Sequence, residues 1–532
     1  MPTLQFKGKT FVQNHHLAVK YHQLVPKKDL SLTDNVSLHD NLIIQGDNLK
    51  ALKALLPTYA GKIKCIYIDP PYNTGNDNGD GKGWIYNDNV NSPMIKEWLG
   101  KEVNLDDLTR HDKWLCMMMP RLKMLKELLS EDGVIFISID NNEIHRLRLL
   151  MDEIFEEFNC ITELVWQKRK GGGNDSFFFA VDHEYILVYA KNKQFQETKW
   201  KTEYTEEYLK RYNAEDDKSK FYWDTLSRAG LNNPIIYDVD CPDGTIIKNG
   251  TWQVSEKTFA TKKSNGDIKF EVNRNGGYTV FHKVRLPKGK TFRSIYSDAT
   301  NKNAADEMQI LFENKKQFSN PKPVALVKTL ISLVAEEDSI ILDSFAGSAT
   351  TAHAVLELNK EDGGNRKFIL VEQEDYANTI TAERVRRVSK GIKKAEDANL
   401  KKGLGGSFSY FELGNEIEME SILRGKNLPS FKEFARYLFY TATGEEFKEK
   451  VINEKTGFIG ESKNYEVYLH YKPNIEWLKK NALTLEEVKA FPKFKSKQRL
   501  VFAPAKYVDD YTLLEHRIDF CQLPYEIYRI QK

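Results

Sequence analysis

The sequence predicts an α/β fold with a mostly parallel sheet, interrupted by one β-rich insert and followed by a smaller α+β domain. Strand-sized apolar runs alternate with segments of helical spacing over residues 41–191, and such alternation is typical of βαβ units. The alternation stops near residue 192 and resumes at Pro321. At 532 residues, the chain is also too long for one ordinary core.

Apolar periodicity locates the elements of the two α/β segments. In the first segment, strands are expected at 64–68, 134–139, 162–166 and 184–189, and helices at 49–56, 113–129 and 144–158. Pro120 is expected to interrupt the second of these helices, because proline removes a backbone donor. In the second segment, helices are expected at 323–334 and 352–358, and strands at 339–342 and 367–371.

The stretch between these segments is rich in aromatic, Asn, Gly and Lys residues, with turn signals such as Pro242-Asp243-Gly244 and a short strand pattern at 278–284. A glycine cluster at 403–406 precedes the last part of the chain. The predicted organisation is an N-terminal extension (1–35), a core in two pieces (36–192 and 320–402), an insert (193–319) and a C-terminal domain (403–532).

Composition excludes several classes of protein. No segment has the length or apolarity of a signal peptide or a membrane span, so we expect a cytoplasmic protein without a membrane partner. The five cysteines lie far apart and form no Cys-x-x-Cys pair, which predicts neither a zinc site nor a disulfide framework. No cluster of metal-ligating residues is evident, and no metal is expected.

The formal net charge is only +2, so contacts with nucleic acid would have to come from local basic patches. Three stretches qualify: Lys168-Arg169-Lys170, residues 384–394 and residues 493–499. Any one patch is more often a solvated charged face than a binding site.

The most specific motif is Asp69-Pro70-Pro71-Tyr72, directly after the strand at 64–68. Two consecutive prolines fix the turn and hold the Asp69 carboxylate and the Pro70 carbonyl at the strand's carboxyl end, where open α/β sheets bind ligands. Two fixed acceptors can take both N–H bonds of an exocyclic amine and leave its lone pair free for attack. Tyr72 offers a flat face for stacking on an extruded base. The alternative, a proline-rich strand exit, explains the tetrapeptide less well.

A second loop, Asp343-Ser344-Phe345-Ala346-Gly347-Ser348, joins the strand at 339–342 to the next helix. Gly347 permits close approach of a ligand, and Ser348 is expected to cap the helix. The spacing is not Gly-x-Gly-x-x-Gly, which speaks against a dinucleotide. Glu372 ends the next strand and could accept hydrogen bonds from ribose hydroxyls, or could simply face solvent. The preceding loop favours the functional interpretation.

These motifs resemble those of amino-group DNA methyltransferases of the β arrangement. In that family the Asp-Pro-Pro-Tyr block precedes the target-recognition region, and the Phe-x-Gly block follows it, as Asp69–Tyr72 and Phe345–Gly347 do here. The resemblance covers about residues 41–395. It implies a Rossmann-like methyltransferase core with permuted motif order, a target-recognition insert and S-adenosylmethionine as cofactor.

The resemblance also assigns roles to residues. Asp69, Pro70, Pro71 and Tyr72 are the implied catalytic residues. The implied cofactor-binding residues are Asp47, Lys322, Asp343, Phe345, Ala346, Gly347, Ser348 and Glu372. Ala349 departs from the family, which often has glycine there, so the loop is expected to be stiffer.

The implied reaction is methyl transfer to N6 of a flipped-out adenine in double-stranded DNA. The long insert and the C-terminal domain resemble the modification subunits of Type III restriction–modification systems, which implies a restriction (helicase-nuclease) subunit as partner and a homodimer. Alternatives are N4-cytosine methylation, an RNA or protein amide methyltransferase, and an inactive DNA-binding specificity subunit. The intact Asp69, Gly347 and Glu372 argue against the last.

Lys168-Arg169-Lys170 precedes three glycines and follows the strand at 162–166. Three adjacent cations suit phosphate contacts, and we expect these residues to form a DNA-binding loop that orders on DNA. An ordinary surface turn is an equally good interpretation of the same residues.

Overall fold

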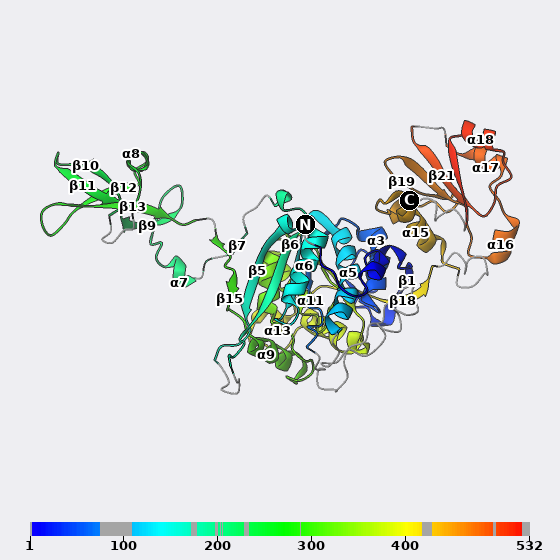
Figure 1. Cartoon of the computed structure of the whole chain (residues 1–532), viewed down its shortest axis with the longest axis horizontal. Helices are drawn as coiled ribbons and strands as arrows, with labels where there is room; N and C mark the ends of the chain where they lie inside the picture. Colours follow the sequence, from blue (N-terminus) through cyan, green and yellow to red (C-terminus); the bar gives the residue numbers. More distant parts are fainter. Residues whose placement is uncertain are drawn as a thin grey trace. The chain divides into compact units, whose positions relative to one another are not determined.

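The computed structural model in Figure 1 describes residues 3–74, 109–171, 178–196, 200–202, 204, 206–227, 233–287, 289–417, 428–492 and 496–523. The chain divides into two compact units. One comprises Met1–Thr198 with Arg293–Lys532, and the other comprises Lys199–Phe292.

The larger unit is built on a ten-stranded sheet. Its strands, in spatial order, are β1 (His22–Pro26), β18 (Ser409–Glu416), β2 (Leu42–Gln45), β17 (Lys367–Glu372), β16 (Ile340–Asp343), β3 (Ile63–Ile68), β4 (Leu129–Ile139), β6 (His183–Ala190), β5 (Cys160–Gln167) and β15 (Ile295–Tyr296). Neighbouring strands from β18 to β4 all run parallel. β6 is antiparallel to both β4 and β5. The predicted mostly parallel α/β sheet is therefore confirmed.

Helices connect and cover these strands. They are α1 (Lys9–Val12), α2 (His15–Ala18), α3 (Asn48–Tyr59), α5 (Arg110–Leu128), α6 (Ile144–Phe155), α9 (Asn301–Phe312), α10 (Val324–Ser332), α11 (Thr350–Asp362), α12 (Glu383–Lys390) and α13 (Ala398–Lys402). Side chains of α3, α5 and α6 form one core cluster with Ile66 and Ile68 of β3. Cys65 and Tyr67 point to the opposite face, because side chains alternate along a strand.

The predicted interruption at Pro120 is wrong, since α5 continues through this residue. Met118, Met119 and Leu122 beside it are buried in the core. Burying side chains of this size stabilises by about 1.5–3 kcal/mol each. Together these contributions offset a penalty of about 3 kcal/mol for a proline inside a helix.

The smaller unit contains three short sheets. β7 (Lys201–Thr202) pairs with β14 (Lys290–Thr291), and β10 (Ile235–Asp240) with β11 (Ile246–Trp252). The remaining sheet has the order β12 (Ile268–Val272), β13 (Tyr278–Arg285), β9 (Lys220–Thr225) and β8 (Ala214–Glu215). The helices are α7 (Glu206–Leu209) and α8 (Glu256–Ser264). Residues of β10, β11, β13 and α8 form a small core with Leu226, and its members are Leu226, Val239, Trp252, Phe259 and Val280.

The C-terminal part forms its own four-stranded sheet in the order β19 (Phe458–Glu461), β20 (Tyr465–Leu469), β21 (Gln498–Ala503) and β22 (Ile518–Gln522). β20, β21 and β22 run parallel, and β19 is antiparallel to β20. The helices here are α15 (Phe431–Thr443), α16 (Ile475–Lys480), α17 (Leu485–Ala490) and α18 (Asp510–Glu515). Because helices join its three parallel strands, this part is α/β rather than the α+β class expected from the sequence.

Three boundaries differ from those predicted. Residues 293–319, expected in the insert, belong to the larger unit, where β15 extends the main sheet beside β5. β18, expected in the C-terminal domain, pairs with β2. β1, expected in an extension, pairs with β18. These strands are held by partners remote in sequence, so local pattern could not assign them.

Among the described residues, no helix combines the length and apolarity needed to cross a membrane. Within the same residues, no group of three or more His, Cys, Asp or Glu side chains is arranged to hold a metal ion.

Candidate active site

Topology brings the sequence motifs to one edge of the main sheet. β2, β17, β16, β3 and β4 run parallel, so the residues that follow them lie at the same edge. β5 is antiparallel to β6, which is antiparallel to β4, so the end of β5 and the start of β6 also reach this edge. Asp69, Asp343, Glu372, Lys168 and Glu184 meet there although they are spread over three hundred positions of the chain.

Asp69 leaves β3 into a firmly held turn. Pro70 is buried, and the carbonyl of Pro71 accepts a hydrogen bond of 2.6 Å from the indole nitrogen of Trp114 in α5. Asn73 is also buried, and its amide donates to the Glu143 carboxylate. The turn that carries Asp69 is therefore pinned from two neighbouring elements.

The two oxygens of Asp69 have different surroundings. Oδ2 accepts a hydrogen bond of 2.6 Å from the Lys322 ammonium. Oδ1 is buried and has no hydrogen-bond partner among the residues that the structure describes. Burial raises the pKa of Asp69, and the Lys322 ammonium partly offsets that rise. A buried acceptor without a donor has a high cost unless a ligand supplies the donor.

Glu184, at the start of β6, joins this group. Its Oε2 accepts from the Tyr72 hydroxyl at 3.0 Å, and its Oε1 accepts from the Lys168 ammonium at 3.1 Å. The Lys322 ammonium lies 3.7 Å from Oε2 and 5.0 Å from the Tyr72 ring centroid. Burial acts to raise the pKa of Glu184, but the two lysines outweigh it, and the pKa is lowered.

Lys322 therefore contacts the predicted catalytic aspartate, where the sequence indicated a cofactor contact. Burial acts to lower the pKa of Lys322, but the carboxylates of Asp69 and Glu184 outweigh it, so the pKa is raised and the side chain stays charged. Sequence reasoning missed Glu184, which is the first residue of the strand expected at 184–189. The signal that could have found Glu184 was a carboxylate at the start of a run of buried strand residues.

Acidic residues fix the shape of the second loop, residues 343–348. Asp343 accepts from the backbone nitrogen of Phe345 at 3.0 Å and from the Thr351 hydroxyl at 2.6 Å. Glu372 accepts from the backbone nitrogens of Gly347 at 2.7 Å and Glu374 at 3.0 Å. Burial raises the pKa of Asp343 and of Glu372 to about 7. Both carboxyls shape the loop in this structure, and their contacts with a ligand stay a prediction.

Ser348 does not cap α11, contrary to the sequence interpretation. The residue before the helix is Ala349, in the left-handed conformation at φ 63°, and no side chain caps the first turn. Ser348 is buried instead, and its hydroxyl accepts from the Arg384 guanidinium at 3.1 Å. Ala346 and Phe345 lie in the same loop, with Ala346 buried and Phe345 half-buried.

Asp47 lies at the amino end of α3 and caps it by accepting from the Lys50 backbone nitrogen at 3.0 Å. The next residue, Asn48, donates from its side chain to the Ser344 carbonyl at 3.2 Å. Asn48 thus ties the start of α3 to the loop that contains Gly347, and a common ligand of Asp47 and Gly347 stays a prediction.

Some cations of the expected basic patches are exposed, and others are buried. Lys168 is largely buried by its ion pair with Glu184, whereas Arg169 and Lys170 are exposed. Gly172 and Gly173 lie outside the described residues. Arg384 and Arg499 were expected in basic patches, but they are 0% and 2% exposed. Arg384 instead joins Glu307 to the Ser348 loop.

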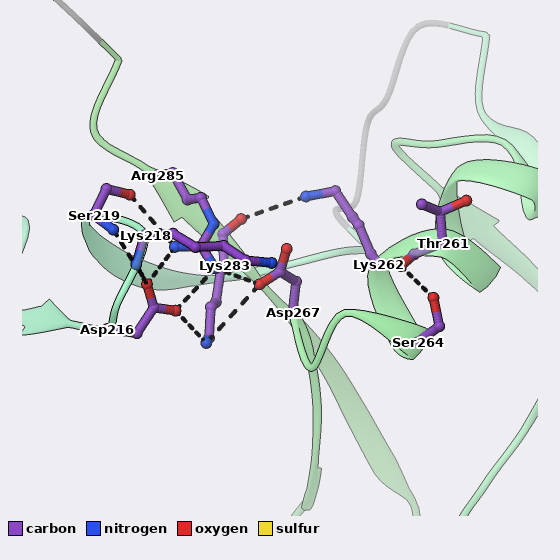
Figure 2. Close-up of polar contacts among 9 residues, drawn as sticks. All are labelled: Asp216, Lys218, Ser219, Thr261, Lys262, Ser264, Asp267, Lys283 and Arg285. Atoms are coloured by element: carbon purple, nitrogen blue, oxygen red, sulfur yellow. Dashed lines mark hydrogen bonds and ion pairs between the residues drawn. The ribbon is translucent and has the colours of Figure 1, made fainter.

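Two cations of the smaller unit are also neutralised internally. Figure 2 shows Lys283 and Arg285 of β13 facing Asp216 and Asp267. The Arg285 guanidinium donates to Asp216 at 2.6 and 2.8 Å and to Asp267 at 2.7 Å, and Lys283 donates to Asp216 at 2.7 Å. These side chains hold the unit together, so phosphate contacts would have to use its other cations.

The fold and the edge site define an α/β protein whose ligands bind at the carboxyl ends of parallel strands. A family model described as DNA methylase, N6_N4_Mtase, matches residues 63–383, which is more than half of the chain. The chain belongs to this family of DNA methylases.

Individual relatives agree with the family. The chain is 34% identical over 398 residues to the Type III restriction-modification enzyme StyLTI Mod subunit of Salmonella typhimurium, covering 71% of this chain and 59% of the relative. It is 34% identical over 387 residues to the EcoPI Mod subunit of Escherichia phage P1, covering 64% and 58%. It is 31% identical over 366 residues to the Type II methyltransferase M.KpnI of Klebsiella pneumoniae, covering 65% and 82%.

The chain thus spans less than two thirds of the length of these two Mod subunits. Among solved structures, the crystal structure of an M1.HpyAVI-SAM complex is 15% identical, with a TM-score of 0.30 over 64% of this chain and 98% of the other.

Proposed function

We propose that the protein transfers a methyl group from S-adenosylmethionine to N6 of an adenine flipped out of double-stranded DNA. The carrying observation is the buried Oδ1 of Asp69, which has no hydrogen-bond partner among the described residues. The turn that follows Asp69 is fixed beside it, because the indole of Trp114 donates to the Pro71 carbonyl. An exocyclic amine has two N–H bonds, and this turn offers two fixed acceptors for them.

The chain's own residues bind and orient the base. The Asp69 carboxylate and the Pro70 carbonyl accept the two N–H bonds, which leaves the amine lone pair directed away from the ring. Tyr72, whose hydroxyl is held by Glu184, presents its ring for stacking. Positioning supplies most of the rate, because the donor is already activated. The reaction needs no covalent enzyme intermediate, so no cysteine has to act.

The residues of the second loop fit the cofactor. When bound, S-adenosylmethionine supplies an electrophilic methyl group. Glu372 keeps further lone pairs for ribose hydroxyls beyond its two backbone bonds, and Phe345 offers an apolar wall. A Cβ on Gly347, which has φ 49°, would lie 3.1 Å from the Phe318 ring, so a larger residue would strain the backbone and press on that ring.

Relatives support a narrower assignment within the family. Mod subunits of Type III enzymes are similar over most of this chain, and we propose that the protein modifies DNA in such a system, with a restriction subunit as partner. A homodimer and a cytoplasmic location stay predictions. N4-cytosine methylation is the second candidate, because the same two acceptors fit either amine.

One assay tests the proposal. The protein is incubated with methyl-labelled S-adenosylmethionine and either mixed-sequence DNA or RNA, and the labelled nucleoside is identified by mass spectrometry. N6-methyladenine in DNA is the expected product. N4-methylcytosine would select the second candidate, and label in RNA alone, or no label, would overturn the proposal.

A further inference from the structure

Lys322 places a cationic N–H donor on Asp69 Oδ2 and over the Tyr72 ring, on which the proposed function stacks the base. Its ammonium lies 2.6 Å from Asp69 Oδ2 and 5.0 Å from the centroid of the Tyr72 ring. It also lies 5.7 Å from the Trp166 ring centroid. Asp69 Oδ1 stays open for the amine of a docked base, but the base also needs the aromatic face that the ammonium covers, so the ammonium and the base compete for that face.

The backbone of Lys322 is held on both sides. Its carbonyl accepts from the Thr350 hydroxyl at 3.1 Å. Two residues on, the Val324 nitrogen donates to both oxygens of Glu307 at 3.1 and 3.2 Å, and Glu307 is paired with Arg384. A change at this site therefore has to come from the flexible lysine side chain rather than from its backbone.

A second carboxylate lies within reach of that side chain. Glu184 Oε2 is 3.7 Å from the Lys322 ammonium, too far for a hydrogen bond but close enough for an ion pair. Glu184 is only 8% exposed, so it does not depend on solvent for its partners. A shift of about one ångström would bring the ammonium to hydrogen-bond distance from Glu184.

We propose that Lys322, while it is paired with Asp69, covers the Tyr72 face that the base needs, and that Glu184 receives the ammonium when the base docks. Glu184 is then a positioning residue that acts through Lys322. This inference rests on the proposed function. The exchange brings no new charge into the site, because two lysines, Lys168 and Lys322, face two carboxylates, Asp69 and Glu184, before and after it.

The exchange can be imitated without DNA. Asp69→Asn removes the carboxylate and leaves Glu184 as the remaining carboxylate beside Lys322. Glu184→Gln should then lower the Tm by about 2–4 °C more in the Asp69→Asn protein than in the wild type. The extra loss should vanish when Lys322→Met is added, because no ammonium is left to transfer.

A static role for Glu184 predicts a different result. If Glu184 only holds Tyr72 and Lys168, Glu184→Gln should lower the Tm equally in the wild-type, Asp69→Asn and Lys322→Met backgrounds. That outcome would overturn the inference.

Methyl transfer gives the second measurement. With Glu184→Gln the ammonium stays on Asp69, so KM for DNA should rise about tenfold while kcat changes less than threefold. In the Lys322→Met background Glu184→Gln should leave KM unchanged, and an equal rise in both backgrounds would contradict the exchange. If the wild type methylates no DNA, the proposed function fails, while the Tm measurements still decide whether Glu184 receives Lys322.

Discussion

At the scale of single residues, the site depends on carboxyls that burial makes easier to protonate. The pKa of Asp69 is raised by burial, with Lys322 opposing the rise, and the pKa of Glu372 is raised to about 7. An ionised Asp69 is a stronger acceptor for an N–H bond of the amine than a protonated one. Lys322 therefore serves to keep the carboxylate charged in the free protein, besides occupying it.

Asp69→Ala should reduce methyl transfer by at least about 10²–10³-fold, the range for losing one positioned polar partner of a transition state. The fold and the cofactor affinity should be largely preserved, because Asp69 contacts the base and not the cofactor. Steady-state assays with labelled cofactor measure the first effect, and calorimetry measures the second. Activity within a few-fold of wild type would remove Asp69 from the proposed role.

Cofactor affinity should fall as the pH falls through about 7. Glu372 has a pKa of about 7 in the folded protein, so ionised acceptor oxygens become scarce below that pH. Because this pKa is raised above the ordinary 4.5, the protonated form favours folding, and this stabilisation is complete below pH 4.5 and lost as the pH rises through 7. Calorimetry at pH 6 and 8 measures the affinity change, and Glu372→Gln should flatten it. The same pH slope in that variant would assign the titration to another group.

At the scale of elements, the turn from β16 to α11 combines two left-handed residues. Gly347 has φ 49° and Ala349 has φ 63°. The left-handed conformation of Ala349 costs about 1–2 kcal/mol. Because Ala349 is fully buried, the burial of its methyl group offsets part of this cost. The sequence predicted a stiffer loop because alanine replaces glycine here, and the left-handed conformation of Ala349 gives a physical reason for that expectation.

Gly347→Trp should abolish measurable S-adenosylmethionine affinity, because even a Cβ there approaches Phe318 to 3.1 Å. Ala349→Gly in the same turn is the matched control. It relieves strain but loses a buried methyl group and adds backbone freedom, so we expect stability to change by less than about 1 kcal/mol. Isothermal calorimetry compares the two. Unchanged affinity in the tryptophan variant would move the cofactor site elsewhere.

The element after β5 should contact phosphates through its exposed cations only. Replacing Arg169 and Lys170 by alanine should weaken DNA binding on every sequence and reduce the slope of log affinity against log salt by up to about 0.9 per lost contact. Lys168→Ala should act differently, since Lys168 is paired with Glu184. Binding titrations at several salt concentrations measure the slope. An unchanged slope in the double variant would make this segment an ordinary surface turn.

At the scale of the whole molecule, the insert that we expect to carry target recognition should be exchangeable at the boundaries of the observed unit, 199–292. Residues 293–319 contribute β15 and α9 to the larger unit, so exchanging 193–319 would break its sheet. Exchanging 199–292 for the corresponding unit of a relative should change the methylated sequence and leave the rate of transfer similar. Sequencing of modified bases in DNA from expressing cells reports the specificity. Methylation of the original sequence would place recognition in the larger unit.

The sequence by itself determined the parts that depend on local pattern. Apolar periodicity located β3, β16 and β17 to within a residue or two, and a rigid turn identified Asp69 without any partner in view. The order of the motifs indicated the family. Such features are encoded by neighbours along the chain, because strand alternation and proline geometry act over a few residues.

Only the tertiary structure decided which side chains meet. Lys322 reaches Asp69 across 253 positions, and Glu184 joins them because the antiparallel β6 begins at the edge where β3 ends. The same pairing of distant strands placed β1 and β18 in the core sheet. It also buried Arg384, which looked like a surface cation. Contacts of this kind follow from sheet order and packing, and no local window of the sequence contains that information.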